Sequence, residues 1–375
     1  MNSPAPLLLS GRCIAVSLLF SVLAPAALLA QGTPPAAPLP PAPLVAGELV
    51  IPLWPAGSPM LKPGTQGFDQ PEKLAPTEGT PGRVQGVTNV HNPSIEVHLA
   101  DKRYNNGAAI ILAPGGGDTS LVVGTEGTDM VPFFYDHNVN TFVLRYRLRP
   151  YSGADANADT AQAVRMVRAH AAEWGVDPKK IGVMGFSAGG ERVAYVTANF
   201  DAGDPKSDDP VARASSRPDF VAGIYPSGSN PSVPANAPPG FFVVSAADTG
   251  HVRDTMGQAT NLMNAGVKFV ELHLYAYGEH GDGMKDRDGN PLGTWQNRFI
   301  DWFRDLGFLN KSGVPTKVSA ASQQAPVAAP AAGAGRGGRR GGRGAPAPVD
   351  GAAAPANGPG SATPATAGRG AAAAQ

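Results

Sequence analysis

The sequence predicts an α/β fold, with a mostly parallel, twisted sheet of about eight strands and helices on both faces. Between residues 48 and 312, short apolar runs alternate with stretches of helical periodicity. Several runs, such as Ala108–Ala113 (AAIILA), are apolar throughout, which is typical of strands buried on both faces of a parallel sheet. No helix separates the first two runs, so we expect an antiparallel start.

The elements follow from these patterns in chain order. Strands are expected at residues 49–53, 94–99, 108–113, 141–146, 180–185, 219–225, 241–245 and 268–275. Helices are expected at residues 125–137, 159–174 and 187–199, from near residue 252, and at 294–306. The last helix carries Trp295, Phe299, Trp302 and Phe303 at helical spacing, and we interpret these rings as core rather than as a ligand cage.

The two ends of the chain differ from this middle. Residues 1–30 are expected to be a cleaved secretory signal peptide, because Arg12 precedes the apolar run Cys13–Leu23 and a small-residue cleavage site follows. The run is shorter than the ~20 residues of a membrane span, which disfavours a transmembrane anchor. We therefore expect a secreted protein, periplasmic or extracellular, with no membrane span after cleavage.

The segments beside the domain are compositionally biased. Residues 31–47 are expected to be a Pro-rich linker and residues 313–375 a disordered tail rich in Ala, Pro, Gly and Arg. The tail holds six basic residues and one acidic residue, and Arg12 is the one charged residue before position 48, which leaves 23 basic and 29 acidic residues in the middle. Because the middle is mildly acidic, we expect no nucleic-acid partner. The one cysteine, Cys13, excludes a disulfide framework within the chain.

The strongest chemical signal is G-x-S-x-G at residues 185–190 (GFSAGG). It follows the apolar run KIGVMG and opens a helical stretch, which is the strand–turn–helix context of a nucleophile elbow. The small residues allow a sharp turn, and Ser187 lies where a helix N-terminus favours negative charge. The alternative is a helix-capping serine, but this context predicts that Ser187 is a nucleophile.

A serine nucleophile needs a base, and in this arrangement the order along the chain is serine, acid, histidine. Of the three histidines after Ser187, His273 lies inside an alternating strand and His251 has no partner in the expected order. His280 lies between glycines in a loop after the last strand, so we assign it as the base.

The acid should follow the preceding strand, FFVVS, where Asp248 lies. Asp248 would orient His280 and stabilise its protonated form. Asp254 and Asp282 compete for this role, and Asp254 is expected to lie inside a helix with poorer reach.

Acyl transfer also requires hydrogen-bond donors for the developing oxyanion. One backbone amide is expected from Ala188, directly after the nucleophile, and a second from the loop PGGG that ends the strand AAIILA. Gly116 and Gly117 are the candidates for the second amide, and the sequence leaves the choice between them open. Glu126, in a nearby loop, is expected to order the oxyanion loop rather than to contact substrate.

At these motifs the chain resembles the acetyl-xylan-esterase-like branch of the α/β hydrolases, which includes bifunctional deacetylase and feruloyl esterases. The resemblance spans roughly residues 53–309 and is carried by APGGG, FVLRYRL, EWGVDPKKIGVMGFSAGG, SAADTGHV and ELHLYAYGEHG. It implies the α/β-hydrolase fold for residues 48–312 and a carboxylic ester hydrolase with no metal and no organic cofactor. The implied substrate is a small-molecule or oligosaccharide ester, such as acetylated plant cell-wall polysaccharide.

Three positions depart from what such relatives commonly carry. Asp118 follows the triple glycine where an aromatic residue is common, Glu191 follows SAGG where histidine is common, and Asp282 replaces an aromatic residue after the histidine. These changes add carboxylates around the expected site.

Residues 286–290 (DRDGN) resemble the start of a calcium-binding loop but lack its later glutamate, so we expect a turn there rather than a calcium site.

Two other functions stay open at this stage. A serine peptidase of the prolyl-oligopeptidase type would share the fold and triad, although the middle of the chain has no room for the large extra domain of such enzymes. A catalytically silent binding module would keep the fold without turnover. The sequence does not determine which acyl group is removed, which sugar carries it, or the oligomeric state.

Overall fold

The computed structural model describes residues 38–228, 232–284 and 291–323 of the chain. The expected signal peptide, most of the linker, the loop at 286–290 and the tail beyond residue 323 lie outside these ranges. Within them, no helix has the length and apolar character needed to cross a bilayer.

A mixed eight-stranded sheet forms the centre of the domain, with the order β1-β4-β6-β5-β7-β8-β9-β10. Its strands are β1 (Leu49–Pro52), β4 (Ser94–His98), β5 (Ala109–Ala113), β6 (Asn140–Arg145), β7 (Ile181–Phe186), β8 (Phe220–Ile224), β9 (Gly240–Ser245) and β10 (Glu271–Tyr275). Strands β1 and β4, and β4 and β6, pair antiparallel, whereas all neighbours from β6 to β10 pair in parallel. The expected antiparallel start and mostly parallel sheet are confirmed.

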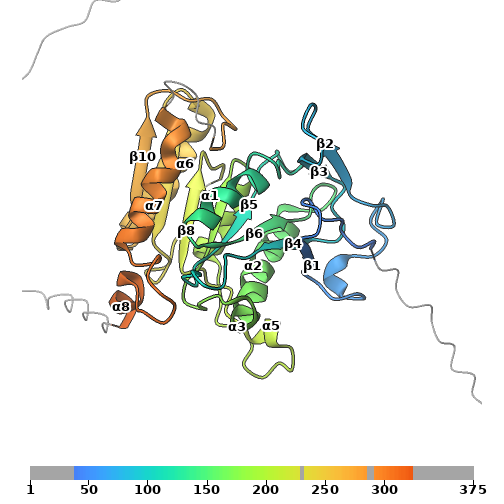
Figure 1. Cartoon of the computed structure of the whole chain (residues 1–375), viewed down its shortest axis with the longest axis horizontal. Helices are drawn as coiled ribbons and strands as arrows, with labels where there is room; N and C mark the ends of the chain where they lie inside the picture. The colour runs from blue at the N-terminus through green and yellow to red at the C-terminus, as the bar shows by residue number, and fades with distance from the viewer. Residues whose placement is uncertain (1–37, 229–231, 285–290, 324–375) are drawn as a thin grey trace, which may run out of the picture. The chain divides into compact units, whose positions relative to one another are not determined.

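Helices cover both faces of this sheet (Figure 1). They are α1 (Val131–Asp136), α2 (Gly153–Ala169), α3 (Ala171–Trp174), α4 (Gly189–Ala198), α5 (Pro210–Arg213), α6 (Thr249–Asn264), α7 (Trp295–Asp305) and α8 (Lys317–Gln323), with single 3-10 turns at Pro59–Leu61, Thr128–Met130 and Pro291–Thr294. Two consecutive residues of β9 show that helices pack on both faces of the sheet. Phe241 packs against Phe299 of α7, and Phe242 clusters with Leu262 of α6. The side chains of Trp295, Phe299, Trp302 and Phe303 are buried, which confirms them as core.

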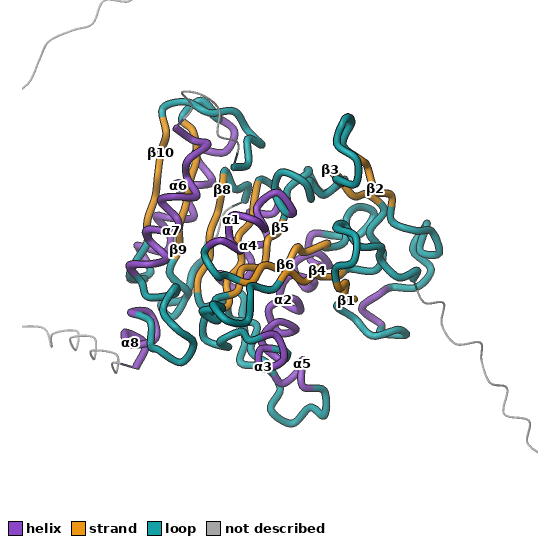
Figure 2. Tube along the Cα trace, in the orientation of Figure 1, coloured by secondary structure: helices purple, strands orange, loops and turns teal. Residues whose placement is uncertain are grey.

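A small hairpin of β2 (Lys73–Pro76) and β3 (Val84–Thr88) lies apart from the large sheet, near β1 and β4 (Figure 2). No expected strand fell in this region. Part of its attachment is a short bridge, in which the backbone N–H and C=O groups of Val87 and Leu121 are mutually hydrogen-bonded at 2.9 and 2.8 Å. The hairpin thereby lies beside the loop that follows β5.

The folded region continues beyond the expected boundary at residue 312. The ammonium group of Lys180, at the amino end of β7, donates to the carbonyl oxygens of Asn310 and Lys311. Thr316 is buried, and the N–H of Lys317 donates to the carbonyl oxygen of Leu306 at 2.9 Å. Residues 313–323 therefore pack onto the domain, and the expected tail start at 313 is too early.

Candidate active site

The turn at Ser187 is a tight connection between β7 and α4. Ser187 has a φ of +49°, an unusual backbone conformation for a residue with a side chain. A Cβ atom on Gly189 would lie 2.0 Å from the carbonyl oxygen of Ala113, and one on Gly185 would lie 2.2 Å from that of Gly189. Only glycine fits at these two positions, so the motif's small residues hold Ser187 at the carboxyl edge of the parallel strands.

The structure brings the three expected triad residues together. Nε2 of His280 lies 2.8 Å from Oγ of Ser187, and its Nδ1 lies 2.7 Å from Oδ2 of Asp248. Asp248 directly precedes α6, and its side chain is 8 % exposed, whereas that of His280 is 37 % exposed. These distances form a continuous hydrogen-bonded line from serine to carboxylate.

The two competing carboxylates have other partners. Oδ2 of Asp254 accepts the N–H of Gly228 at 2.9 Å from within α6, as its expected helical position implied. Asp282 is buried, and its Oδ2 accepts the N–H of Glu279 at 3.0 Å within its own loop. His273 lies on β10 and pairs with Glu271. The geometry therefore favours Asp248 and His280 over these alternatives.

The glycine loop after β5 lies against the serine. The N–H of Gly115 donates to Oε2 of Glu126 at 2.7 Å, so this amide is already engaged. The amides of Gly116, Gly117 and Ala188 have no hydrogen-bond acceptor among the described residues. Their N–H groups are thus available to an oxyanion, in line with the sequence expectation, and both glycines remain candidates.

Glu126 is the buried residue that orders this loop. Its second oxygen accepts the hydroxyl of Tyr225 at 3.1 Å, and that hydroxyl in turn accepts the N–H of Gly283 at 3.0 Å. The ring of Tyr225 packs edge-on against His280, with centroids 5.0 Å apart. Glu126 therefore links the glycine loop to the histidine loop through one tyrosine. Burial raises the pKa of Glu126 to about 7, although its hydrogen bonds from Gly115 and Tyr225 oppose this shift.

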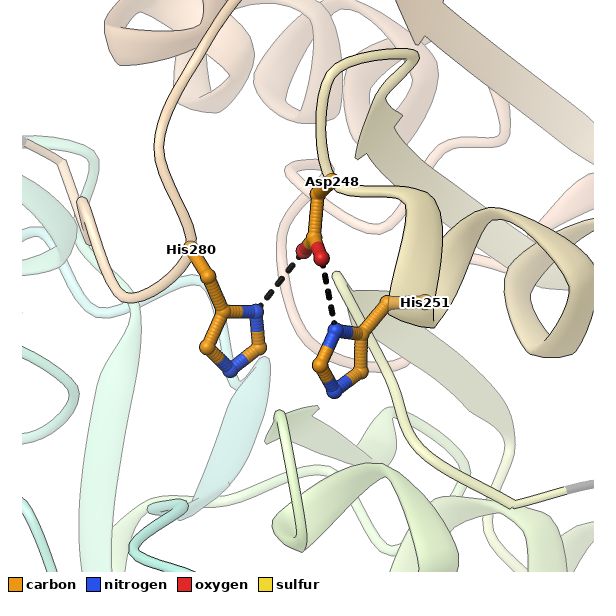
Figure 3. A group of neighbouring side chains, drawn as sticks. All are labelled: Asp248, His251 and His280. Atoms are coloured by element: carbon orange, nitrogen blue, oxygen red, sulfur yellow. Dashed lines mark hydrogen bonds and ion pairs between the residues drawn. The ribbon is translucent and has the colours of Figure 1, made fainter. Parts of the chain in front are cut away.

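His251 also joins the site, which the sequence analysis missed. Its Nδ1 lies 2.8 Å from Oδ1 of Asp248, and its ring stacks on that of His280 at 3.9 Å (Figure 3). Each imidazole faces a different oxygen of one carboxylate. The available signal was its spacing, since a residue three positions after Asp248 in the first turn of a helix lies on the same face.

Donor atoms of Asp248, His251 and His280 lie within 4.8 Å of one another, which is metal-ligand spacing. The two ring planes, however, differ by only 14°. An ion shared by both Nδ1 atoms would lie out of both ring planes, whereas the nitrogen lone pair lies in the plane. The arrangement fits two N–H donors on one carboxylate better than a metal site.

A pocket of about 440 Å³ opens above Ser187. Its lining includes Gly116, Gly117, Glu126 and His280. Gln85 of the β2–β3 hairpin also lines it and lies 3.4 Å from the hydroxyl of Thr125. This second missed residue carries no local motif and reaches the site only through the tertiary position of the hairpin.

Comparisons with known proteins agree with this fold. The BD-FAE family model matches residues 95–211. Endo-1,4-beta-xylanase B of Butyrivibrio fibrisolvens is 34% identical over 122 residues (31% of this chain, 19% of that protein). Acetylxylan esterase of Xylanibacter ruminicola is 34% identical over 92 residues (24% and 19%). The chain thus matches about a fifth of the length of these curated relatives.

A solved structure matches over a larger part of the chain. The acetyl ester-xyloside bifunctional hydrolase from Caldicellulosiruptor lactoaceticus is 28% identical with a TM-score of 0.56, covering 71% of this chain and 99% of that one. The sheet, the elbow and this likeness define the class of fold, which is that of the α/β hydrolases. Within that class, the expected resemblance to the acetyl-xylan-esterase-like branch is confirmed.

Proposed function

We propose that this chain is a secreted serine ester hydrolase that removes acetyl or related acyl groups from plant cell-wall polysaccharide or its oligosaccharides through an acyl-enzyme. The observation that carries the proposal is the position of His280, whose two ring nitrogens lie 2.8 Å from Ser187 Oγ and 2.7 Å from Asp248 Oδ2. Two similar proteins, one named an acetylxylan esterase and one an acetyl ester-xyloside bifunctional hydrolase, support the choice of an ester on a glycan.

The mechanism has two acyl-transfer steps. His280 takes the proton of Ser187 as its oxygen attacks the ester carbonyl, and Asp248 stabilises the imidazolium that forms. The amide of Ala188 and that of Gly116 or Gly117 donate to the tetrahedral oxyanion, and the N-terminal end of α4 favours the same charge. The alcohol leaves with the proton from His280, and water then releases the acyl group by the same route.

The triad is tested by Ser187→Ala with p-nitrophenyl acetate as substrate. We expect kcat to fall by at least about 10³-fold, while the thermal unfolding midpoint changes little, because the smaller side chain fits the same turn. Ser215→Ala, at a half-buried serine that lines neither the pocket nor the elbow, is the matched control and should keep full activity. Activity that survives in Ser187→Ala would remove Ser187 as the nucleophile.

Two further measurements separate the alternatives. A fluorophosphonate probe should label the wild-type chain and not Ser187→Ala, whereas a silent binding module would remain unlabelled. Acetylated xylo-oligosaccharides should be turned over and dipeptide amides should not. Faster turnover of the amides would favour a peptidase.

A further inference from the structure

A second pocket, of about 410 Å³, lies next to the pocket over Ser187. Asp118, Arg149 and Arg192 line it, and Asp118 directly follows Gly117, which lines the first pocket. The N–H of Arg149 donates to the carbonyl oxygen of Asp118 at 2.9 Å, which ties the segment after β6 to the glycine loop. Arg192 lies one helical turn after Ala188 on α4. The pocket therefore borders both sources of the proposed oxyanion donors.

Two residues that line this pocket each have a buried polar atom without a hydrogen-bond partner among the described residues, Nε of Arg192 and Oδ1 of Asp118. Arg192 is only 1 % exposed, and its other nitrogens contact Glu191 at 2.7 Å and the carbonyl oxygen of Gly153 at 3.4 Å. Asp118 Oδ1 is 4.0 Å from the nearest Arg192 nitrogen. Buried polar atoms are normally paired, so one donor and one acceptor here await a partner.

The charges around the pocket are balanced. The Arg147 guanidinium pairs with Asp159 at 2.7 Å and lies 3.7 Å from Asp155, which also pairs with Lys62. Arg192 pairs with Glu191, and the negative charge of Asp118 balances the positive charge of the exposed Arg149 in the lining of the pocket. A balanced set of donors and acceptors suits a neutral ligand whose groups both donate and accept. Hydroxyl groups have this property.

We propose that this pocket, here called the Asp118–Arg192 pocket, is a saccharide subsite that binds the hydroxyl groups of a neutral sugar unit beside the ester-bearing unit. The Asp118 carboxylate, whose side chain is 27 % exposed, accepts from one hydroxyl, and the exposed Arg149 guanidinium donates to a neighbouring hydroxyl. This inference rests on the proposed function, because it assigns a position to the glycan of the same ester substrate. It also gives a role to Asp118 and Glu191, the two carboxylates that converge on Arg192.

The choice of variant follows from the backbone. Asp118 has a φ of +58°, so alanine there would strain the glycine loop. Asp118→Gly deletes the carboxylate and tolerates this conformation, and Asp118→Asn keeps an accepting oxygen. Asp301→Ala on α7 is the matched control, because Asp301 also pairs with arginine but lines neither pocket.

The test compares kcat/KM for acetylated xylotriose with kcat/KM for p-nitrophenyl acetate, which has no sugar. In Asp118→Gly we expect this ratio to fall about tenfold, mainly through KM, since a lost hydrogen bond to a charged group has about that effect. Asp118→Asn should recover most of the ratio, and Asp301→Ala should leave it unchanged.

Several results would overturn the subsite. An unchanged ratio in Asp118→Gly would remove Asp118 from sugar binding, and an equal fall on both substrates would show that it acts through the glycine loop. An effect confined to oligosaccharides bearing uronic acid would replace the neutral-sugar assignment with a carboxylate site. A wild-type chain that hydrolyses p-nitrophenyl acetate but not acetylated xylotriose would overturn the subsite and leave the esterase triad standing.

Discussion

Ser187 and His280 lie at the same point of the structure but are held there by different means. Ser187 is held by the main chain, since its carbonyl oxygen accepts the N–H groups of Gly190 and Ser227, each at 2.8 Å. His280 lies in a loop with left-handed glycines on both sides, Gly278 and Gly281, and is held by side chains. The position of Ser187 thus depends on main-chain contacts, whereas that of His280 depends on side chains from distant parts of the chain.

The contacts that hold His280 come from separate segments. Asp248 and His251 lie at the start of α6, and Tyr225 follows β8. Glu126, which follows the glycine loop, accepts the hydroxyl of Tyr225. If this contrast is correct, changes in these distant residues should affect the histidine side of the site while leaving the elbow intact.

The largest effect is expected for Asp248→Asn. The amide would present an N–H to one of the two imidazoles and disfavour the His280 tautomer that accepts the serine proton, and kcat should fall by about 10³- to 10⁴-fold. The measurement is kcat for p-nitrophenyl acetate, with the unfolding midpoint recorded alongside.

Asp254→Asn is the control for that change. Asp254 is half-buried on the same helix, and an asparagine oxygen can still accept the N–H of Gly228. Activity within about twofold of wild type is expected. A larger loss in Asp254→Asn than in Asp248→Asn would move the acid role to Asp254.

An intermediate effect is expected on stability for Glu126→Gln. The pKa of Glu126 is raised to about 7 in the folded protein from an ordinary value of 4.5, so the folded state keeps a proton that the unfolded chain releases. Wild-type stability should therefore decrease as pH rises from about 4.5 to about 7, by up to about 3 kcal/mol from this group. Glutamine does not titrate and should lack this decrease.

Urea unfolding at pH 5 and pH 8 checks this prediction. The free energy of unfolding of Glu126→Gln minus that of wild type should increase from pH 5 to pH 8, because only the wild type loses stability over this range. Parallel pH profiles for the two proteins would show that Glu126 ionises at the same pH in the folded and unfolded states.

The smallest effect is expected for Tyr225→Phe. The hydroxyl accepts from Gly283 and donates to Glu126, so its loss leaves the buried N–H of Gly283 unpaired and loosens the loop of His280. We expect kcat to fall about tenfold, with KM little changed.

Tyr195→Phe provides the matched comparison, because the Tyr195 hydroxyl on α4 has no hydrogen bond within the described residues. This variant should retain wild-type kcat. Equal activity in the two phenylalanine variants would show that the tyrosine link does not position His280.

Much of the fold could be predicted because the apolar runs are local signals. The continuous apolar residues of β5, β7 and β9 identify strands buried on both faces, and the order serine, acid, histidine then places the site at their carboxyl ends. The elbow is also a local signal in the sequence, although only the need for Gly185 arises from a contact a few residues away, because Gly189 is required by the distant carbonyl group of Ala113.

The parts that were missed depend on tertiary packing. The β2–β3 hairpin has half-exposed strands without a clear alternation, and Tyr225 is an ordinary aromatic residue after a strand until Glu126 and Gly283 surround it. Helix α2 begins at Gly153, six residues before the expected start at 159. The capping box of Ser152 and Asp155 was the local signal for that earlier start.

The stacked imidazoles on Asp248 have a consequence for chemical labelling. Diethyl pyrocarbonate, which acylates accessible ring nitrogens, would meet His251 and His280 side by side, with side-chain exposures of 22 % and 37 %. Inactivation of the wild-type chain by this reagent would therefore report on a pair of rings. In a chain carrying His251→Phe, the same reagent would react with only one ring of this pair, that of His280. The rate of inactivation would then measure how accessible the His280 imidazole is.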